Sequence, residues 1–443
     1  MTKPHILVLG GGEDQLPAYH AARRLGYGVV GVDQRPHALG ASAADLFLCM
    51  TTRAPERIAA MVGHLDIAAV ISPASDAAQE SVAELSRLLE TPYRPAPDAV
   101  RASVDKGYFH EVLERLGLPT YAYVQSADPV ELRLAAAALP MPVIVKPSDS
   151  SGSKGVQVVA DQAALPAAVA EARTYSFSGE VIVEEMLLGR HLSAEAFLRD
   201  AKLATIAVTE RSTTGAPHMI TTGHTVPAEL APVTEIALRS MVMDICGALG
   251  HTDGPVNFDF VVDRTEEIRF IEMGARLGGN GMPLLVRHAY GIDTYEAALR
   301  LALGLPFELQ ARHDKKTALQ ILSTDTDGIL RTIEGADAVR ALPQTAELRI
   351  FPTPGSRVKR YTQAGHKLGY LLLVADTYGE LREAQARARS LLRFEVEPDA
   401  PSAPAPTAAA ARVPAAAAPA PAPEPAPAST AVPIRTDLLT EKR

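Results

Sequence analysis

The stretch that decides the fold reads Phe270-Ile271-Glu272-Met273-Gly274-Ala275-Arg276-Leu277-Gly278-Gly279. A hydrophobic strand is expected to carry Glu272 near its end, and Arg276 follows four residues later. Thirteen residues before Glu272 lies Asp259, within Asn257-Phe258-Asp259-Phe260-Val261-Val262. The polar residues 263–267 between the two segments predict a hairpin turn. A turn centred on Thr265 and Glu266 sets Asp259 directly opposite Glu272.

Two carboxylates held face to face repel each other unless a cation lies between them. Side chains opposite each other in a ladder are about 5 Å apart, so one ion reaches both. Their oxygen atoms suit Mg²⁺, which proteins commonly hold with one or two carboxylates together with substrate phosphates. The hairpin therefore predicts a magnesium–nucleotide site at Asp259 and Glu272, with Mn²⁺ as the alternative metal and Arg276 within reach of a transferred phosphate.

Composition narrows the class of protein. The 443 residues are enough for two to four domains, and 47% hydrophobic with 21% charged residues is an ordinary globular balance. A net charge of −9 argues against a broad nucleic-acid-binding face.

The two cysteines, Cys49 and Cys246, show no metal spacing and make a disulfide framework implausible. Because no apolar run approaches the roughly 20 residues of a membrane span, and no signal-peptide pattern opens the chain, we expect a soluble, cytoplasmic protein that binds neither nucleic acid nor membrane.

The first hundred residues alternate strands with helices. Strands are expected at 5–9, 28–33 and 68–72, with helices near 15–25 and 77–89. This alternation indicates a doubly wound parallel sheet, and so an α/β fold class. Asp76, just after the third strand, is interpreted either as a helix cap, which is favoured, or as a pocket carboxylate.

A glycine run follows the first strand. Gly10-Gly11-Gly12 departs from the dinucleotide fingerprint, because Gln15 stands where the third glycine would be. An NAD site with Asp33 on the ribose is therefore the weaker interpretation. A tight strand-to-helix turn, able to line a substrate pocket, is the stronger one.

The middle of the chain carries two lysines and a small polar loop. Lys106 lies in an expected helix over 98–116, and Lys146 ends an expected strand over 142–147. Residues 148–155, Ser-Asp-Ser-Ser-Gly-Ser-Lys-Gly, join that strand to another at 156–159. Such a loop can fold its backbone N–H groups over phosphates, although taken alone it is more often a flexible turn. A strand at 181–183 and helices over 232–249 and 283–303 are also expected.

The end of the chain changes in composition. Residues 317–396 are expected to form a third unit with a strand at 370–375 and a closing helix near 380–392. Residues 401–433 are almost only Ala and Pro, so a disordered Ala/Pro-rich tail is expected over 397–443. Residues 434–443 are interpreted as an end without function or, less favoured, as a peptide that docks a partner protein.

Taken together, these pieces resemble the ATP-grasp superfamily over residues 1–396. The resemblance implies an α+β architecture in four parts. These are a Rossmann-like pre-ATP-grasp domain (1–97), a two-lobed ATP-grasp domain (98–312) with its flap and small lobe at about 120–190, a small C-terminal α+β ligase-associated domain (313–396) and the tail. It also implies ATP as the nucleotide.

The resemblance also assigns roles to individual residues. Lys106 and Lys146 would hold phosphates, and Ser153 and Gly155 belong to a flap that closes over the triphosphate. A hinge would hold adenine, and His191 or Glu195 would contact ribose or support the nucleotide. Asp259 and Glu272 would bind the metal, and Arg276 is the catalytic residue that steadies the transferring phosphoryl group. The hinge comprises Glu184, Glu185, Met186 and Leu187.

Two positions depart from the family's pattern. The family usually has Glu-x-Asn-x-Arg at the metal strand, and Gly274 occupies the Asn position here. Water can fill a coordination place on Mg²⁺, which readily keeps its waters. The ribose-contact acid expected after the hinge is His191 in this chain.

Residues 276–283, Arg-Leu-Gly-Gly-Asn-Gly-Met-Pro, resemble the amino-acid ligase branch of carboxylate–amine ligases. Gly291-Ile292-Asp293 and the segment around His224 agree with that branch. The resemblance implies a substrate pocket near Asp76, His224, Gly279 and Asn280, small-molecule carboxylate and amine substrates, and a homodimer. The implied reaction is ATP-dependent amide formation through an acyl phosphate, releasing ADP and phosphate. The alternatives are a bicarbonate- or formate-activating enzyme of carboxylase or purine-synthesis type, and a catalytically degenerate ATP-binding scaffold.

Overall fold

The N-terminal part is a four-stranded parallel sheet in the computed structural model, which describes residues 3–399. Its strand order is β3 (Leu46–Cys49), β2 (Gly28–Asp33), β1 (His5–Leu9) and β4 (Ile67–Ile71). Ile6 and Val8 are buried in one hydrophobic cluster and Leu7 and Leu9 in another, as a sheet covered on both faces requires. The doubly wound sheet is therefore confirmed. The helices around it are α1 (Leu16–Arg24), η1 (Leu39–Ser42), α2 (Pro55–Val62), η2 (Asp76–Ala78) and α3 (Gln79–Leu88).

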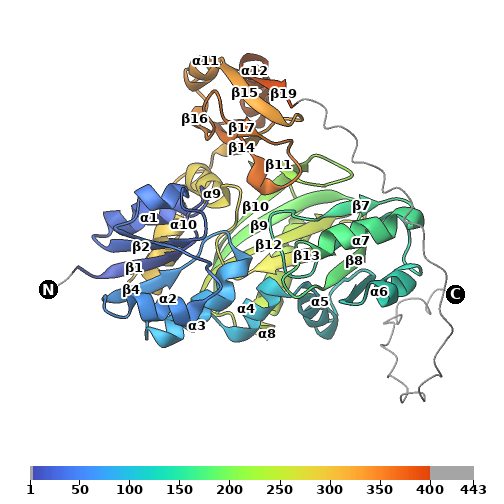
Figure 1. Cartoon of the computed structure of the whole chain (residues 1–443), viewed down its shortest axis with the longest axis horizontal. Helices are drawn as coiled ribbons and strands as arrows, with labels where there is room; N and C mark the ends of the chain where they lie inside the picture. The colour runs from blue at the N-terminus through green and yellow to red at the C-terminus, as the bar shows by residue number, and fades with distance from the viewer. Residues whose placement is uncertain (1–2, 400–443) are drawn as a thin grey trace, which may run out of the picture.

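A second, antiparallel sheet forms a small lobe on the other side of the molecule (Figure 1). Its order is β5 (Tyr123–Ser126), β8 (Val181–Glu185), β6 (Val143–Pro147) and β7 (Gln157–Val159). Helices α6 (Pro129–Ala136) and α7 (Leu165–Arg173) pack on it through Leu132, Leu165 and Val169, with η3 (Gln162–Ala164) leading into α7. Residues 148–155, called the flap from here on, connect β6 to β7.

The largest sheet has eight strands and joins the rest of the chain together. Helices α4 (Pro97–Val104), α5 (Lys106–Arg115) and α8 (Pro232–Ala248) pack on one face around Phe258, Phe260 and Phe270. Helices α9 (Met282–Tyr290) and α10 (Thr294–Ala302) pack on the other. The strand order is β13 (Ile268–Gly274), β12 (Gly254–Val262), β9 (Arg190–Arg199), β10 (Lys202–Thr213), β11 (Thr221–Val226), β14 (Lys316–Leu322), β18 (Gly369–Ala375) and β16 (Thr345–Ile350).

The C-terminal unit shares this sheet. Strands β14, β18 and β16 continue it beyond β11, so the boundary expected at residue 313 divides the chain but not the sheet. A separate three-stranded sheet of β17 (Arg357–Val358), β15 (Gly328–Glu334) and β19 (Arg393–Pro398) completes the unit. Its helices are α11 (Ala336–Arg340), η4 (Ala364–His366) and α12 (Tyr378–Leu391). Strand β19 extends into the first two residues assigned to the tail, whose residues 400–443 lie outside the described part.

Two helices expected to be continuous are each interrupted. The segment 98–116 breaks at Asp105, whose backbone is extended (φ −120°, ψ 103°) and whose carboxylate accepts a hydrogen bond from the Tyr108 N–H. The segment 283–303 breaks at Gly291, which has φ +73°. Each break starts a new helix, and the first places Lys106 at an N-terminus. Within residues 3–399, no helix is long and apolar enough to cross a membrane.

The cap at Asp105 gives a prediction about stability. Asp105→Ala removes the acceptor for the Tyr108 N–H and should lower the free energy of unfolding by about 1 kcal/mol. Asp105→Asn keeps an acceptor oxygen and should cost much less. Urea unfolding followed by circular dichroism measures both variants. Equal destabilisation by the two substitutions would contradict the capping role.

Candidate active site

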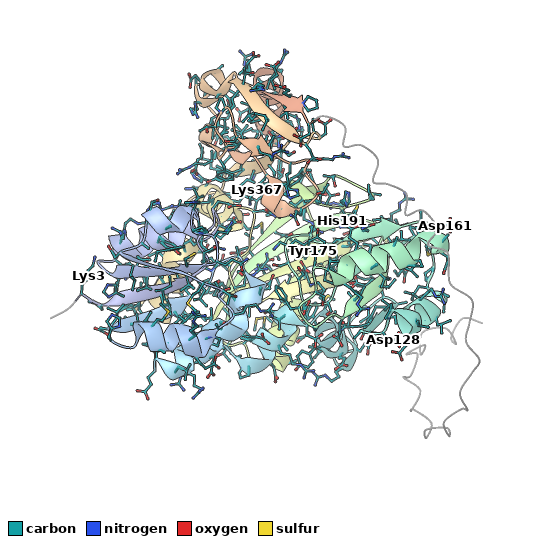
Figure 2. All side chains as sticks on the ribbon, viewed as in Figure 1. Lys3, Asp128, Asp161, Tyr175, His191 and Lys367 are labelled. Carbon is teal, nitrogen blue, oxygen red and sulfur yellow. The ribbon has the colours of Figure 1, made fainter. Side chains whose placement is uncertain are left out.

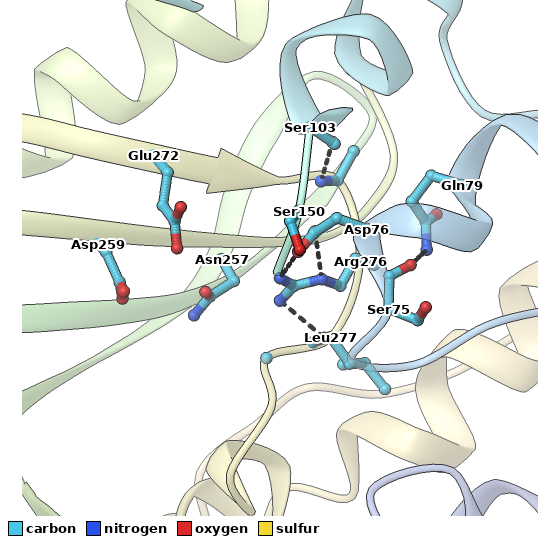
Figure 3. A network of polar contacts seen from close by, with 12 residues as sticks. Ser75, Asp76, Gln79, Ser103, Ser150, Asn257, Asp259, Glu272, Arg276 and Leu277 are labelled. Atoms are coloured by element: carbon cyan, nitrogen blue, oxygen red, sulfur yellow. Dashed lines mark hydrogen bonds and ion pairs between the residues drawn. The ribbon is translucent and has the colours of Figure 1, made fainter. Parts of the chain in front are cut away.

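Asp259 and Glu272 lie directly opposite each other on β12 and β13, as predicted. The turn is not the expected one. Phe260 pairs with Phe270 and Val262 with Ile268, so the register beside the turn is centred on Thr265 alone. A bulge then skips Ile271 and restores the opposition of the two carboxylates. Figure 3 shows both side chains on the same side of the hairpin.

Cationic side chains surround the two carboxylates. Asp259 is ion-paired with Arg211 and accepts a 2.5 Å hydrogen bond from Ser193 Oγ. Glu272 Oε2 lies 3.5 Å from Lys106 Nζ. Burial raises the pKa of Asp259 against the opposing charge of Arg211. For Glu272 the burial effect is outweighed by Lys106, Lys146 and Arg211, which lower its pKa to about 2. The surrounding cations therefore favour the ionised form of Glu272, whereas for Asp259 burial outweighs the opposing effect of Arg211.

The two predicted phosphate lysines approach the carboxylates from different elements. Lys106 begins α5, and its Nζ donates to the flap carbonyl of Ser150 at 3.1 Å. Lys146 is buried on β6 and lies 2.7 Å from Glu184 Oε2. Glu184 Oε1 lies 3.4 Å from His110 Nε2, so both oxygens of this hinge carboxylate have partners inside the protein. Glu184 therefore positions Lys146, which differs from the adenine contact expected of its side chain.

These residues line a cavity of about 100 Å³, called the inner cavity, between the small lobe and the eight-stranded sheet. The flap covers it with residues 150–154, and Gly152, Ser153 and Gly155 have positive φ angles. A Cβ on Gly155 would lie 2.7 Å from Tyr175 Cδ2, so this glycine allows the end of the flap to pack on the small lobe. Side chains that line the inner cavity include Lys106, Lys146, Ser153, Glu184, Glu185, Leu187, His191, Arg211, Asp259 and Glu272.

Three residues expected to bind ATP do not line the inner cavity. Gly155 and Met186 are sequence neighbours of residues that line the inner cavity but do not line it themselves. The Met186 N–H donates to Pro142 O at 3.3 Å. Glu195 is buried and accepts a hydrogen bond from the Gly278 N–H at 2.8 Å. It therefore supports the loop after Arg276. Burial raises the pKa of Glu195 to about 8, although the Gly278 N–H and Arg276 oppose the shift.

His191, which was expected to contact ribose or support the nucleotide, lines the inner cavity. Its Nδ1 lies 3.4 Å from Arg211 Nη2, and burial together with Arg211 lowers its pKa to about 4. At neutral pH the imidazole is uncharged, so it can accept or donate one hydrogen bond to a bound molecule without adding charge.

Arg276 makes a bidentate contact with Asp76. Its Nε and Nη2 donate to Asp76 Oδ1 and Oδ2 at 2.7 Å each, which fixes the plane of the guanidinium (Figure 3). Asp76 is the first residue of η2 and caps no helix with its side chain, so the favoured capping interpretation was wrong.

The same contact lies beside the glycine at position 274. A Cβ there would lie 2.7 Å from Asp76 Oδ1 and 2.8 Å from Arg276 Cζ. These distances are shorter than ordinary atomic contacts, so any side chain would displace the Asp76–Arg276 pair. The position of the family's Asn is therefore occupied here by the ends of the Asp76 and Arg276 side chains.

A second cavity of about 560 Å³, the outer cleft, opens between the N-terminal sheet, the eight-stranded sheet and the C-terminal unit. It contains the predicted pocket residues Asp76, His224, Gly279 and Asn280, together with Arg276. It shares Arg211, Asp259, Glu272 and flap residues 151–154 with the inner cavity. The two cavities therefore meet at the carboxylate pair. His224 Nδ1 lies 2.9 Å from Thr209 Oγ1, and burial with Arg211 lowers its pKa to about 3.

The glycine loop of the N-terminal sheet borders the outer cleft without the features of an NAD site. Gln15 occupies the loop, where its Oε1 accepts from the Gly12 N–H at 3.0 Å and its Nε2 donates to Pro73 O at 2.7 Å. Asp33 accepts from the Gly11 N–H and is ion-paired with Arg35 at 2.8 Å. Its carboxylate is thus engaged within the protein, which agrees with the stronger, tight-turn interpretation.

Sequence reasoning missed the residues that join the three units. Lys367 Nζ lies 2.8 Å from Glu13 Oε1 and 3.3 Å from both Asp14 Oδ2 and Asn280 Oδ1. Figure 2 shows Lys367 at the base of the C-terminal unit. The Ala364 N–H donates to flap residue Gly152 at 3.1 Å. No local pattern signals these contacts, because the partners are far apart in the sequence, by 87 residues for Lys367 and Asn280 and by 353 for Lys367 and Asp14.

Comparisons with known proteins agree with this geometry. The family model "Carbamoyl-phosphate synthase L chain, ATP binding domain" matches residues 105–310, and "L-amino acid ligase C-terminal domain 2" matches residues 320–397. The L-amino acid ligase from Bacillus licheniformis superposes with a TM-score of 0.77 at 19% identity, covering 90% of this chain and 100% of that one. Phosphoribosylglycinamide synthetase from Anaerococcus prevotii gives 0.69 at 21%, covering 89% and 100%.

Two relatives share more sequence. The uncharacterized protein y4rH of Sinorhizobium fredii is 29% identical over 318 residues, which is 70% of this chain but only 64% of that protein's length. The formate-dependent phosphoribosylglycinamide formyltransferase of Paraburkholderia xenovorans is 29% identical over 405 residues, covering 88% and 95%. The two family matches make residues 105–310 and 320–397 similar to domains of ATP-grasp ligases, and the solved structures share the fold. The C-terminal match is to the L-amino acid ligase model.

The buried carboxyl of Glu195 predicts a dependence of stability on pH. Its folded pKa is raised from 4.5 to about 8, so the folded state prefers the protonated form. The stability it contributes is complete below pH 4.5 and declines as the pH rises towards 8. Glu195→Gln stays neutral, so it should gain stability relative to the parent between pH 5 and pH 8. Thermal midpoints of both proteins at the two pH values test this, and an equal difference at both would contradict it.

Proposed function

We propose that this protein is an ATP-dependent carboxylate–amine ligase that forms an amide bond through an acyl phosphate. The observation that carries the proposal is the meeting of the two cavities at Asp259, Glu272 and the flap. A nucleotide in the inner cavity would direct its terminal phosphate towards the outer cleft. A carboxylate substrate in that cleft would then lie beside Arg276. This arrangement suits phosphoryl transfer, which depends mostly on positioning and charge stabilisation.

The residues divide the reaction into two steps. A carboxylate oxygen of the first substrate attacks the γ-phosphorus of ATP, and ADP leaves. The amine nitrogen then attacks the acyl carbon, phosphate leaves, and the nitrogen loses a proton. Lys106 and Lys146 lie on the nucleotide side, where they balance phosphate charge. Arg276 is oriented by Asp76 and by the bond from its Nη1 to Leu277 O at 3.2 Å, and it would place positive charge beside the transferring group in the outer cleft.

The donor set fits a divalent cation. Asp259 and Glu272 supply hard oxygen atoms at facing positions, and the low pKa of Glu272 keeps it ionised at neutral pH. A Mg²⁺ or Mn²⁺ ion held there would neutralise charge on the triphosphate. The flap would exclude water, which otherwise hydrolyses an acyl phosphate. The contact of Gly152 with Ala364 links that closure to the C-terminal unit.

A formate-activating enzyme of purine-synthesis type is the second candidate. It is favoured by the formate-dependent relative, whose match spans 88% of this chain. The C-terminal match to the L-amino acid ligase model favours the first candidate. A cytoplasmic location and a homodimer stay predictions for either enzyme.

A phosphate-release screen decides between these functions. Purified protein with Mg²⁺ and ATP is offered a matrix of amino acids, and separately formate with phosphoribosylglycinamide, or bicarbonate. We expect phosphate release only with certain amino-acid pairs, and mass spectrometry should show a product equal to the two substrates minus water. Release with formate or bicarbonate and none with amino acids would overturn the ligase proposal. Nucleotide binding without release under any condition would favour the scaffold.

The metal carboxylate gives a second, matched test. Glu272→Gln should reduce phosphate release by at least about 100-fold, because phosphoryl transfer depends on the charge held at this position. Glu267→Gln, in the turn of the same hairpin and outside both cavities, is the control and should retain activity. Circular dichroism verifies the fold of both variants. Full turnover by Glu272→Gln would show that the metal site is misplaced.

A further inference from the structure

A third oxygen-bearing side chain lies on the carboxylate face of the hairpin. Asn257 and Asp259 are two residues apart on β12, so their side chains point to the same face. Asp259 pairs with Glu272, and Asn257 pairs with Gly274, which has no side chain. Figure 3 shows Asn257 between Asp259 and the Arg276 guanidinium. Asn257 therefore provides the only side chain of its ladder pair.

The space above Gly274 cannot be used by another ligand from β13. The Asp76–Arg276 pair already fills it, with Asp76 Oδ1 2.7 Å from where a Cβ would lie. The chain has two asparagines, Asn257 and Asn280, and Asn280 hydrogen-bonds Lys367 away from the hairpin. Of the two asparagines, Asn257 is therefore the one on the carboxylate face of the hairpin.

The amide of Asn257 is fixed by its nitrogen. Its Nδ2 donates to Ala194 O on β9 at 3.2 Å, and the same amide lies beside Glu195. Asn257 lines the outer cleft together with Asp259 and Glu272. Because Nδ2 is bonded to the neighbouring strand, Oδ1 is the amide atom that is available to a ligand in that cleft. An amide oxygen is a hard, neutral ligand of the kind that accompanies carboxylates around oxygen-binding cations.

The proposed cation site has two acidic ligands, Asp259 and Glu272. Among residues 3–399, no group of three His, Cys, Asp or Glu side chains is arranged to hold a metal ion. We propose that Asn257, through Oδ1, is the third protein ligand of the divalent cation held by Asp259 and Glu272. This proposal rests on the cation–nucleotide part of the proposed function and is independent of which carboxylate and amine are joined.

Mn²⁺ binding tests the proposal without turnover. The full chain is titrated with Mn²⁺ in the presence of a non-hydrolysable ATP analogue, and free Mn²⁺ is measured by electron paramagnetic resonance. Asn257→Ala should weaken Mn²⁺ binding by about 10-fold or more, a loss at least as large as that typical for groups supporting a metal ligand. Asn257→Asp replaces the amide oxygen by a carboxylate oxygen and should retain the affinity. Gln162→Ala, which removes an exposed amide in η3 of the small lobe and outside both cavities, is the control and should bind Mn²⁺ like the parent.

The outcomes separate a ligand from a merely structural residue. An unchanged affinity in Asn257→Ala would overturn the proposal. So would an equal loss in Asn257→Asp, because that result would assign the role to the bond from Nδ2 to Ala194. Thermal midpoints of both variants exclude unfolding as the cause of a loss. Because no acyl or amine substrate is present, failure of the ligase function leaves this test unaffected, whereas parent protein that binds no Mn²⁺ would refute the cation site itself.

Discussion

The structure depends on two negative charges placed opposite each other in one hairpin. Asp259 and Glu272 repel at this distance, and the surrounding protein offsets that repulsion with Arg211 on Asp259 and Lys106 near Glu272. Each cation belongs to a different element, so the charge balance ties β10 and α5 to the hairpin. The hairpin carboxylates are thus held by cations from two separate elements.

The loop after the hairpin joins the three units around that charge. Arg276 binds Asp76 of the N-terminal part, and Gly278 is held by Glu195 of β9. Asn280 then meets Lys367 of the C-terminal unit, which also contacts Glu13 and Asp14. One stretch of five residues therefore contacts the N-terminal part, the eight-stranded sheet and the C-terminal unit.

Prediction from sequence succeeded where a pattern is local. The strands at 5–9 and 28–33 coincide with β1 and β2, and the facing of Asp259 and Glu272 followed from alternation and a polar turn. It failed in three places, two of them for local reasons and one because a distant partner decides. Asp105 interrupts an apolar helical pattern because its own side chain caps the next helix. Edge strand β3, with Leu46 exposed, lacks the long apolar run that marks a buried parallel strand. Asp76 was misassigned because its partner Arg276 lies 200 residues away.

The sequence by itself determined the parallel N-terminal sheet, the carboxylate hairpin, and the order of lysine, flap, hinge and metal residues, because each rests on short-range periodicity or on motif order. Only the tertiary structure decided the duties of these side chains. Glu184 is ion-paired with Lys146, Asp76 is ion-paired with Arg276, and Glu195 accepts a hydrogen bond from the Gly278 N–H. Each carboxylate has such a partner because a charged or polar group is costly to bury alone. The tertiary structure also showed that the volume beside Gly274 is filled by Asp76 and Arg276, two residues that lie 200 positions apart in the sequence.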